Sequence, residues 1–287
     1  MDEQSRDPLR GQLPDMTKAR LLGQGRTAEV FVYESKYVIK LFRPSFPKQA
    51  IDHEYRVCRE IASAIDIPAA HAQFAVDGRE AILFDRVDGE SGMKHLLRHP
   101  WKVKSLAEQF ASIHAQVHAV PIAGELPPLK SILIRNMQMH EMLPNAMRDR
   151  IIRFLDNLPE GQALCHGDFH PDNLLFQGNR PFVLDWMTAA RGNPLADVAR
   201  TSILLRWAHP GPGIPKSFAA LLNSMRGNFY RHYLAHYLAL TGADAREIVQ
   251  WELPVMAARL MEWIPPAEKE LLVRKINELL DSGAVPA

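Results

Sequence analysis

The chain has 287 residues, of which 47% are hydrophobic and 23% charged, an ordinary composition for a globular protein. Its 34 basic and 33 acidic residues nearly cancel, so the charge gives no reason to expect nucleic acid or a membrane as partner. No stretch approaches the roughly 20 apolar residues of a membrane span, and because the N-terminal residues are charged and contain no apolar run, we expect no signal peptide. Two cysteines far apart favour a reduced, cytoplasmic protein over a disulfide.

The first third of the chain reads as a β-rich lobe. Residues 1–15 are polar and predict a flexible N-terminal arm, and residues 16–84 predict the lobe itself. Short runs rich in Val, Ile, Tyr and Phe predict strands, and apolar residues at helical spacing predict one helix. The strands are expected at 19–23, 29–34, 37–42, 72–76 and 80–87, and the helix at 48–65.

The remainder is helical in texture, apart from the stretch around 165–185. Residues 85–90 predict a hinge, and residues 91–287 a larger helical lobe. The clearest helical patterns cover 104–120, 195–207, 217–240, 245–263 and 267–280. The sequence therefore predicts an α+β fold, with a small antiparallel β lobe and a larger helical lobe.

A glycine pair lies between the first two predicted strands. Gly23 and Gly25, with Arg26 and Thr27 after them, form the pattern G-x-G-x-x-A-x-V. A helix would follow the glycines in a dinucleotide-binding fingerprint, but a strand follows here. This context fits a glycine flap over nucleotide phosphates, where missing Cβ atoms let backbone N–H groups approach phosphate oxygens. Two glycines in a plain hairpin remain the alternative.

A lysine interrupts the apolar strand "YVIKLF". Strand alternation places Val38 and Lys40 on one face, and Y-V-I-K is close to the strand motif whose lysine holds α- and β-phosphates. A solvated lysine on an edge strand is the alternative. A phosphate lysine needs a carboxylate partner, and Glu54 lies at the edge of the apolar stripe of the 48–65 helix. Glu60 points to the opposite side, so Glu54 is the expected partner.

The stretch "CHGDFHPDNLLF" concentrates polar side chains before an apolar run. His166, Asp168 and Asn173 match H-x-D-x-x-x-x-N, in which Asp accepts the proton of the substrate hydroxyl and Asn binds Mg²⁺. Twelve residues after Asn173, Asp185 ends the apolar run "FVLD". A buried unpaired carboxylate is costly, which makes Asp185 the expected second Mg²⁺ ligand. Pairing of Asp185 with Arg191 is the alternative.

The segments "HGDFHPDNLL", "VLDW" and "RGNPLADVA" together resemble the aminoglycoside phosphotransferase and choline kinase group. These are small-molecule kinases with a protein-kinase-like fold, and the resemblance extends over roughly residues 18–260. It implies ATP, Mg²⁺ and transfer of phosphate to a hydroxyl. It also implies that Asp168 is the base, that Asn173 and Asp185 hold Mg²⁺, and that Lys40 holds phosphate.

The resemblance assigns supporting roles as well. Asp197, in "NPLADVA", matches a position that braces the catalytic loop, although helix capping alone would explain an acid there. The segment that connects the two predicted lobes resembles a hinge whose backbone binds adenine. The residues that this resemblance assigns to adenine binding are Leu83, Phe84, Asp85 and Val87. His166 is grouped with the catalytic residues. His170 could contact the γ-phosphate if protonated, or could simply structure the loop.

The sequence departs from protein kinases after Asp185. The stretch Asp185-Trp186-Met187 lacks the glycine of D-F-G, no A-P-E motif follows, and only a short segment precedes Gly192. A long activation loop that docks protein substrates is therefore not expected. A non-catalytic nucleotide-binding module and an atypical protein kinase remain the alternatives to a small-molecule kinase.

The acceptor is left open among aminoglycoside-like, choline-like, sugar and amino-alcohol hydroxyls. A polycation would require carboxylates, yet residues 201–240 contain no Asp or Glu. Glu252 and Glu262 could reach a cleft or remain solvated. Aromatic residues could cage a choline-like cation or pack helices; these are Trp207, Tyr230, Tyr233, Tyr237, Trp251 and Trp263. His114 and His118 are expected to pack or be solvated. The oligomeric state is not predicted.

Overall fold

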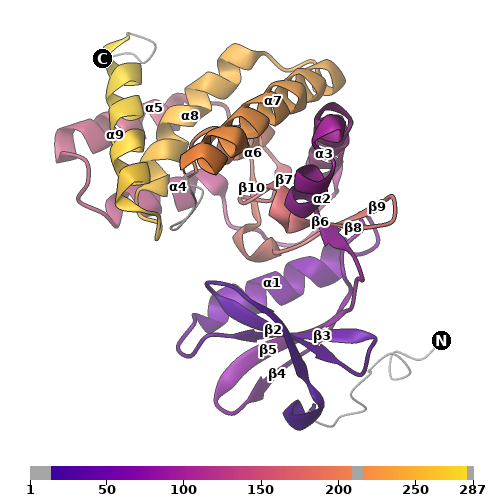
Figure 1. The fold of residues 1–287 in the computed structure, drawn as a ribbon. Coiled ribbons are helices and arrows are strands. Elements are labelled where there is room, and N and C mark those ends of the chain that lie inside the picture. Colours follow the sequence, from indigo (N-terminus) through magenta and orange to yellow (C-terminus); the bar gives the residue numbers. More distant parts are fainter. Residues whose placement is uncertain (1–13, 209–215, 283–287) are drawn as a thin grey trace. The chain divides into compact units, whose positions relative to one another are not determined.

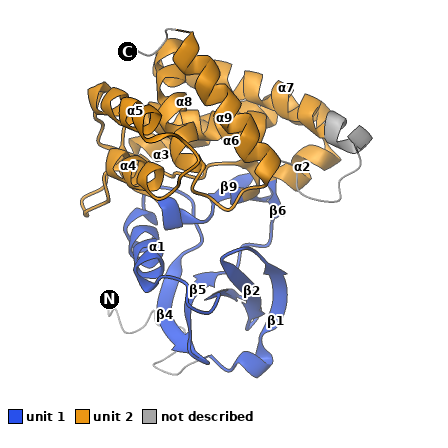
Figure 2. Ribbon diagram, turned by 90° about the vertical axis from the view of Figure 1, so that its left-hand side faces the viewer, with its two compact units in different colours: residues 1–91, 173–188 blue, residues 92–172, 189–287 orange. Residues whose placement is uncertain are grey.

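A computed structural model describes residues 14–208 and 216–282 of the chain. The described residues belong to two compact units, shown in different colours in Figure 2. The first contains residues up to 91 together with 173–188, and the second contains 92–172 and 189 onward. Most of the predicted N-terminal arm, residues 1–13, lies outside the described residues. The first described element is the short 3-10 helix η2 (Met16–Lys18), which Asp15 caps.

The first unit is built on a five-stranded antiparallel sheet with the order β1-β2-β3-β5-β4 (Figure 1). The strands are β1 (Arg20–Gln24), β2 (Ala28–Tyr33), β3 (Tyr37–Phe42), β4 (Ala70–Val76) and β5 (Arg79–Asp85). Helix α1 (Lys48–Ile61) packs against β4 and β5. Two tight turns join neighbouring strands, and Ser35 and Asp77 take the left-handed backbone conformation in them. The predicted strands and helix of the β-rich lobe are present.

Side-chain alternation along β3 divides this sheet into two faces. Ile39 and Leu41 lie in the core cluster with Leu83, and both are buried. Val38 and Lys40 point to the other face, where they line a cavity. The period of a strand thus separates core residues from site residues within one six-residue segment.

A second sheet completes the first unit. Its strands are β6 (Glu90–Ser91), β8 (Leu174–Gln177) and β9 (Arg180–Val183), in the order β6-β8-β9. Gly89 precedes β6 at a close approach, because an added Cβ would lie 2.8 Å from the carbonyl oxygen of Phe176. The sequence places residues 173–188 in the helical lobe, whereas here they group with the first unit. The reason is strand pairing: β8 pairs with β6, and Val183 N–H donates to the carbonyl of Asp66.

The second unit is mainly helical (Figure 1). Helices α6 to α9 coincide closely with four predicted helical patterns, and α3 with a fifth. The helices are α2 (Gly92–Arg98), α3 (Val103–Ala119), α4 (Leu129–Gln138), α5 (Asn145–Asn157), α6 (Pro194–Trp207), α7 (Lys216–Thr241), α8 (Ala245–Arg259) and α9 (Pro266–Asp281). A two-stranded sheet in this unit pairs β7 (Ala163–Cys165) with β10 (Ala190–Gly192), and η3 (Pro100–Lys102) is one of its 3-10 turns. The turn η4 (Pro171–Asn173) ends at the first residue of the 173–188 segment, and η5 (Trp186–Thr188) belongs to the first unit.

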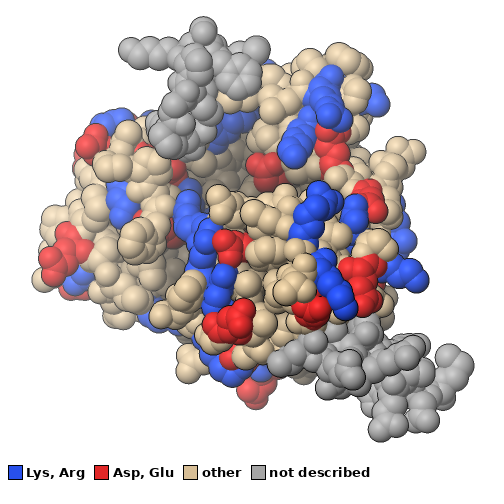
Figure 3. Space-filling view, turned by 60° about the horizontal axis from the view of Figure 1, so that its bottom comes forward, with Lys and Arg blue, Asp and Glu red and all other residues tan. Residues whose placement is uncertain are grey.

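The surface reflects the balanced composition of the chain. On the face shown in Figure 3, basic and acidic side chains alternate and do not gather into a large area of one sign. Among the described residues, no helix combines the length and the apolar character that a bilayer crossing requires.

Candidate active site

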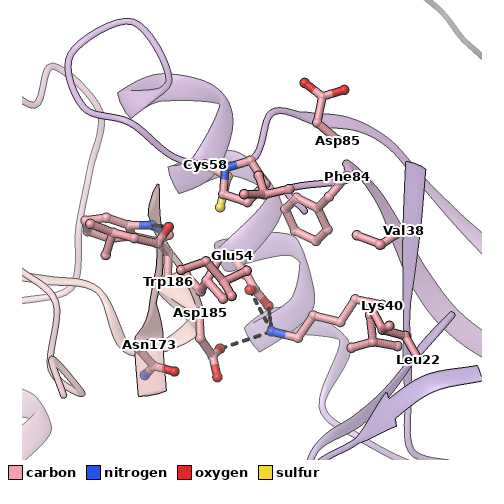
Figure 4. Close-up of a pocket in the computed structure, with 16 residues that line it drawn as sticks. Leu22, Val38, Lys40, Glu54, Cys58, Phe84, Asp85, Asn173, Asp185 and Trp186 are labelled. Atoms are coloured by element: carbon pink, nitrogen blue, oxygen red, sulfur yellow. Dashed lines mark hydrogen bonds and ion pairs between the residues drawn. The ribbon is translucent and has the colours of Figure 1, made fainter. Parts of the chain in front are cut away.

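A cavity of about 250 Å³ lies within the first unit, between the sheet, α1 and the segment that follows β9 (Figure 4). Its walls are mostly apolar, and Lys40, Glu54 and Asp185 gather at one end. The lining residues are Leu22, Val30, Val38, Lys40, Glu54, Cys58, Pro68, Phe84, Asp85, Val87, Asn173, Leu175, Val183, Leu184, Asp185 and Trp186. An apolar cavity with a few convergent polar groups is the usual form of a small-molecule site.

Lys40 lies between two carboxylates at the polar end of this cavity (Figure 4). Its Nζ donates to Glu54 Oε1 at 2.7 Å and Oε2 at 2.8 Å, and to Asp185 Oδ1 at 3.0 Å. The predicted pairing of Lys40 with Glu54 is therefore present. Burial alone would lower the pKa of Lys40, but the charges of Glu54 and Asp185 outweigh it and raise the pKa. The ammonium is charged and fixed in place.

Asp185 has an unusual backbone conformation. Its φ is +63°, in the left-handed region that few residues other than glycine adopt. Such a conformation costs about 1 kcal/mol or more, and residues that retain it often lie at functional sites. The turn directs the carboxylate of Asp185 toward Lys40, while 37% of its side chain stays exposed. Within the first unit, Lys40 is the ion-pair partner of this carboxylate.

Asn173 and Asp185 lie on adjacent backbone segments, because Leu184 N–H donates to the carbonyl of Asn173 at 2.9 Å. Both side chains line the cavity, next to Lys40 (Figure 4). They offer one carboxylate and one amide oxygen, which are hard ligands of the type that Mg²⁺ prefers. Mg²⁺ usually takes one or two protein carboxylates and completes its shell with water and substrate phosphates. The residues present thus fit a magnesium site.

The glycine turn connects β1 to β2 at the rim of the first sheet. Gly25 N–H donates to the carbonyl of Ala28 at 2.8 Å, and Arg43 N–H to the carbonyl of Thr27 at 2.8 Å. A Cβ added at Gly23 would meet no atom within 4 Å, and one at Gly25 would meet only ordinary contacts. The fold of this unit therefore does not require glycine at either position. Arg26 belongs to the same turn and does not line the cavity.

The predicted adenine-reading segment divides between two faces. Phe84, Asp85 and Val87 line the cavity. Leu83 is fully buried in the core cluster on the other side of the sheet, so its side chain does not face the cavity. Asp85 also accepts a bond of 2.7 Å from His71 Nε2. Among these positions, Leu83 could take part in a site only through its backbone.

In the second unit, one face of α6 holds the loop that follows β7. Asp197 Oδ2 accepts from His166 N–H at 2.6 Å, and Oδ1 from Gly167 N–H at 2.9 Å. Thr201 Oγ1 donates to the carbonyl of Phe169 at 2.9 Å, and Arg200 Nε to the carbonyl of Gly167 at 3.2 Å. Positions 197, 200 and 201 share a helix face because their spacing is three and four residues. Four hydrogen bonds thereby fix the loop backbone at residues 166, 167 and 169.

The carboxylate of Asp168 belongs to this loop and is partly exposed, with 32% of its side chain accessible. Arg200 donates to its Oδ1 at 3.3 Å, and His170 Nε2 lies 3.4 Å from its Oδ2. Burial would raise the pKa of Asp168, but the hydrogen bond from His170 and the charge of Arg200 lower it well below its ordinary value. Asp168 is therefore ionised at neutral pH and can act as a proton acceptor.

The histidines near Asp197 have structural contacts. His166 is fully buried, and its Nδ1 accepts from Asp168 N–H at 3.2 Å, so it supports the loop. His114 Nε2 and His118 Nε2 lie 3.1 and 3.3 Å from Asp197 Oδ2. These three side chains could in principle surround a cation. However, Asp197 already accepts two backbone N–H bonds, and the pKa of His114 is lowered to about 3, mainly by burial. Their packing role is thus the one that the geometry supports.

Residues 18–248 match the model of the phosphotransferase enzyme family. The chain belongs to the phosphotransferase enzyme family. This match covers most of the chain and agrees with the resemblance that its motifs indicated.

Solved structures with the same fold include aminoglycoside phosphotransferases and a choline/ethanolamine kinase family protein. One is a thermostable mutant of the aminoglycoside phosphotransferase APH(4)-Ia, with 16% identity, a TM-score of 0.67, and coverage of 93% of this chain and 94% of that one. The streptomycin–ATP complex of APH(2")-IIa has 16% identity and a TM-score of 0.62, with coverage of 97% and 96%. A choline/ethanolamine kinase family protein from Mesorhizobium loti has 16% identity and a TM-score of 0.61, with coverage of 96% and 91%. These similarities confirm the predicted fold.

A curated relative is acyl-CoA dehydrogenase family member 11 of Mus musculus, which is 35% identical over 81 residues. The orthologous protein of Rattus norvegicus shows the same identity over the same length. The match covers 26% of this chain and only 10% of the relative's length.

Two acids that the sequence offered for acceptor binding are engaged in ion pairs within this phosphotransferase. Glu262 accepts from Arg200 at 2.5 and 3.0 Å and from Arg259 at 2.6 Å. Glu252 is 5% exposed and pairs with Arg206, whose guanidinium lies 4.0 Å from the Trp207 ring centroid. Neither carboxylate is simply solvated.

The aromatic residues mostly pack the helical unit. Tyr233, Tyr237 and Trp251 are buried, and the two tyrosine hydroxyls bond to His114 and His118 at 2.8 Å. Trp263, in contrast, is 87% exposed. A cage of these buried rings around a choline-like cation is not formed.

Several residues of these sites were not singled out from the sequence. Arg200 is the most important, and its spacing of three from Asp197 on a predicted helix was the available signal. Cys58 lines the cavity as well, on the same helix as Glu54. Trp186 was noted only as a departure from D-F-G, yet it also lines the cavity.

Proposed function

We propose that this phosphotransferase transfers the γ-phosphoryl group of ATP, with Mg²⁺, to a hydroxyl of a small molecule. The observation that carries the proposal is the position of Lys40 between buried Glu54 and exposed Asp185, at the polar end of an apolar cavity. A fixed cation beside hard oxygen ligands suits a polyphosphate, and the apolar walls suit a nucleobase.

On the donor side, the adenine would occupy the apolar part of the cavity, beside Phe84 and Val87. Lys40 would bind the phosphates, and Asn173 with Asp185 would hold the metal. When bound, Mg²⁺ would neutralise charge on the phosphate oxygens. The glycine turn would add backbone N–H groups, as in related kinase flaps. In support of this role, members of the fold with ATP and ADP bound have been solved.

On the acceptor side, Asp168 would orient the hydroxyl and take its proton. The hydroxyl oxygen forms the new bond to the γ-phosphorus, the bond from that phosphorus to the β-bridging oxygen breaks, and ADP leaves. The proton passes to the carboxylate of Asp168, which is ionised beforehand. Because phosphoryl transfer needs little covalent help, accurate placement of Asp168 supplies much of the effect.

We further propose that the acceptor is not a polycation. Solved relatives of this fold bind streptomycin or hygromycin B, which would require clustered carboxylates in a comparable site. Here Glu252 and Glu262 are occupied by arginines, and residues 201–240 contribute no acid. Neutral sugars and polyols, or hydroxyl compounds with at most one charged group, fit this charge pattern better.

The test is a screen for acceptor-dependent ADP release in the presence of Mg²⁺. Aminoglycosides, amino alcohols, neutral polyols and hydroxy acids would be compared, with Asp168→Ala as the catalytic control. ADP release from the wild type alone, with acceptors of low charge, supports the proposal. Nucleotide binding without release for any acceptor would favour a non-catalytic binding module. Phosphate transfer only to proteins would favour an atypical protein kinase.

A further inference from the structure

Arg200 has a contact set that no sequence motif assigns. Only 14% of its side chain is exposed, and its guanidinium contacts three groups at once. Nε donates to the carbonyl of Gly167, NH1 and NH2 form a two-pronged pair with Glu262, and NH2 also donates to Asp168 Oδ1. A planar guanidinium held at three points cannot rotate without breaking several bonds.

The partner of Arg200 is itself anchored. Glu262 accepts from Arg259 at 2.6 Å, and Arg259 donates from Nε and NH2 to buried Glu268 at 2.9 and 2.6 Å. Acidic and basic groups therefore alternate from Glu268 to Asp168. This charge chain, Glu268–Arg259–Glu262–Arg200–Asp168, connects the start of α9 to the loop after β7.

A chain of buried charges costs desolvation free energy and contributes little net stability to a fold. Buried ion pairs lose much of their attraction to desolvation, and apolar residues of similar volume often stabilise a protein as well or better. The chain also ends on Asp168, a partly exposed carboxylate of the loop. Arg200 donates to Oδ1 of that carboxylate, and His170 Nε2 lies near its Oδ2.

We propose that Arg200 is a positioning residue that fixes the orientation of the Asp168 carboxylate for proton acceptance. The proposal rests on the function proposed above. Arg200 acts through Asp168, since its other donors are used by Gly167 and Glu262. Lysine cannot replace it fully, because a single ammonium cannot bind Glu262 in two-pronged fashion while also reaching Asp168.

The main experiment compares Arg200→Met with Arg206→Met. Arg206 lies on the same helix and also pairs with a buried glutamate, but it does not contact the loop, so it is the matched control. We expect Arg200→Met to lower kcat by roughly 100-fold with the KM for ATP within a few-fold of wild type, because only the orientation of Asp168 is lost. Arg206→Met should leave kcat within a few-fold. Added guanidinium at non-denaturing concentration should restore part of kcat in Arg200→Met alone.

A second variant and a second readout keep the test decisive. Arg200→Lys retains the charge without the fork and should give an intermediate kcat at a wild-type melting temperature. Labelling of Asp168 by a carbodiimide, followed by mass spectrometry, reports on its protonation independently of ATP. The groups that face Asp168 are Arg200, His170 and His166. Loss of Arg200 should move the onset of Asp168 labelling to higher pH. Because His170 and His166 are present in both variants, such a shift is due to position 200.

The outcomes separate this inference from the proposed function. Equal kcat values in Arg200→Met and Arg206→Met would overturn the inference that Arg200 positions Asp168. A loss of kcat in Arg200→Met that shows neither rescue by guanidinium nor a shift in the labelling of Asp168 would overturn it too. Absence of ADP release from the wild type with every acceptor would instead overturn the proposed function. In that case, an unchanged labelling profile in Arg200→Met would overturn the inference too, whereas a shifted one would retain Arg200 as the residue that sets the state of Asp168.

Discussion

Replacement of Glu54 by glutamine tests how Lys40 is held. Glu54 is 2% exposed and accepts from Lys40 with both oxygens, while Asp185 accepts a third bond. Glutamine has nearly the same shape but no charge, so Lys40 would keep one neutral acceptor on helix α1 and one carboxylate, Asp185. One charge-assisted hydrogen bond contributes about 1.5–3 kcal/mol. Since 1.4 kcal/mol is a factor of ten, we expect Mg·ATP to bind roughly 10- to 100-fold more weakly.

The substitution should also change the demand for Mg²⁺. With Glu54 neutral, Lys40 depends on Asp185, the proposed metal ligand, for its only full counter-charge. The ammonium would then compete with the metal, and the Mg²⁺ concentration for half-maximal binding should rise. Calorimetric titration with ATP at several Mg²⁺ concentrations measures both effects without a known acceptor.

Two comparisons make this test specific. Glu60→Gln, on the same helix but outside the cavity, is the control and should bind Mg·ATP as the wild type does. In a double-mutant cycle, Lys40→Met and Glu54→Gln should be strongly non-additive, because both remove the same interaction. Wild-type affinity in Glu54→Gln, or full additivity with Lys40→Met, would show that Glu54 does not position the lysine.

Three further predictions use other parts of the molecule. Asp185→Asn should keep the wild-type melting temperature, because Asn tolerates the left-handed backbone at φ +63°. The variant should nevertheless lower the rate of ADP release at least ~100-fold. Loss of the fold in this variant would contradict the prediction. Gly25→Ala should leave the free energy of unfolding unchanged, since the added Cβ meets only ordinary contacts, but should raise the KM for ATP; an unchanged KM would speak against the flap. His114 is neutral when folded, with a pKa of about 3, so the unfolded chain binds more protons below pH ~6.5 and stability falls as pH falls. Between pH 7.5 and 5.0, His114 should lower the free energy of unfolding, measured with urea, by roughly 2 kcal/mol. His114→Gln should not show this part of the decrease.

Local period and spacing were sufficient to predict much of the donor site. Alternation along β3 placed Lys40 opposite the core, and the 100° step of a helix selected Glu54 over Glu60. The antiparallel sheet and the larger helices followed from the same two periods. These features depend on residues close together in sequence, or on faces that a regular element defines by itself.

Contacts between distant segments could not be predicted in this way. Arg200 and Glu262 are separated by 62 positions, and nothing local indicates that the end of α8 meets α6 at that point. The grouping of residues 173–188 with the first unit depends on the pairing of β8 with β6, two strands more than 80 residues apart. Leu83 shows a smaller difficulty of the same kind, because only the register of β5 decides which side chains face the cavity.

The two proposed sites use one electrostatic arrangement with different cations. Lys40 lies between Glu54 and Asp185, and Arg200 lies between Glu262 and Asp168. In each, one carboxylate anchors the cation, and the other is the more exposed and is the one proposed to act on ligand or metal.

The choice of cation then follows from what each must do. A phosphate-binding cation has to transfer part of its bonding from Asp185 to the incoming oxygens, and a flexible lysine with three donors on one atom can do so. A positioning cation must keep the Asp168 carboxylate in one orientation, which favours the fixed planar fork of arginine. Exchange of the two cation types, Lys40→Arg and Arg200→Lys, should therefore impair both positions although no charge changes.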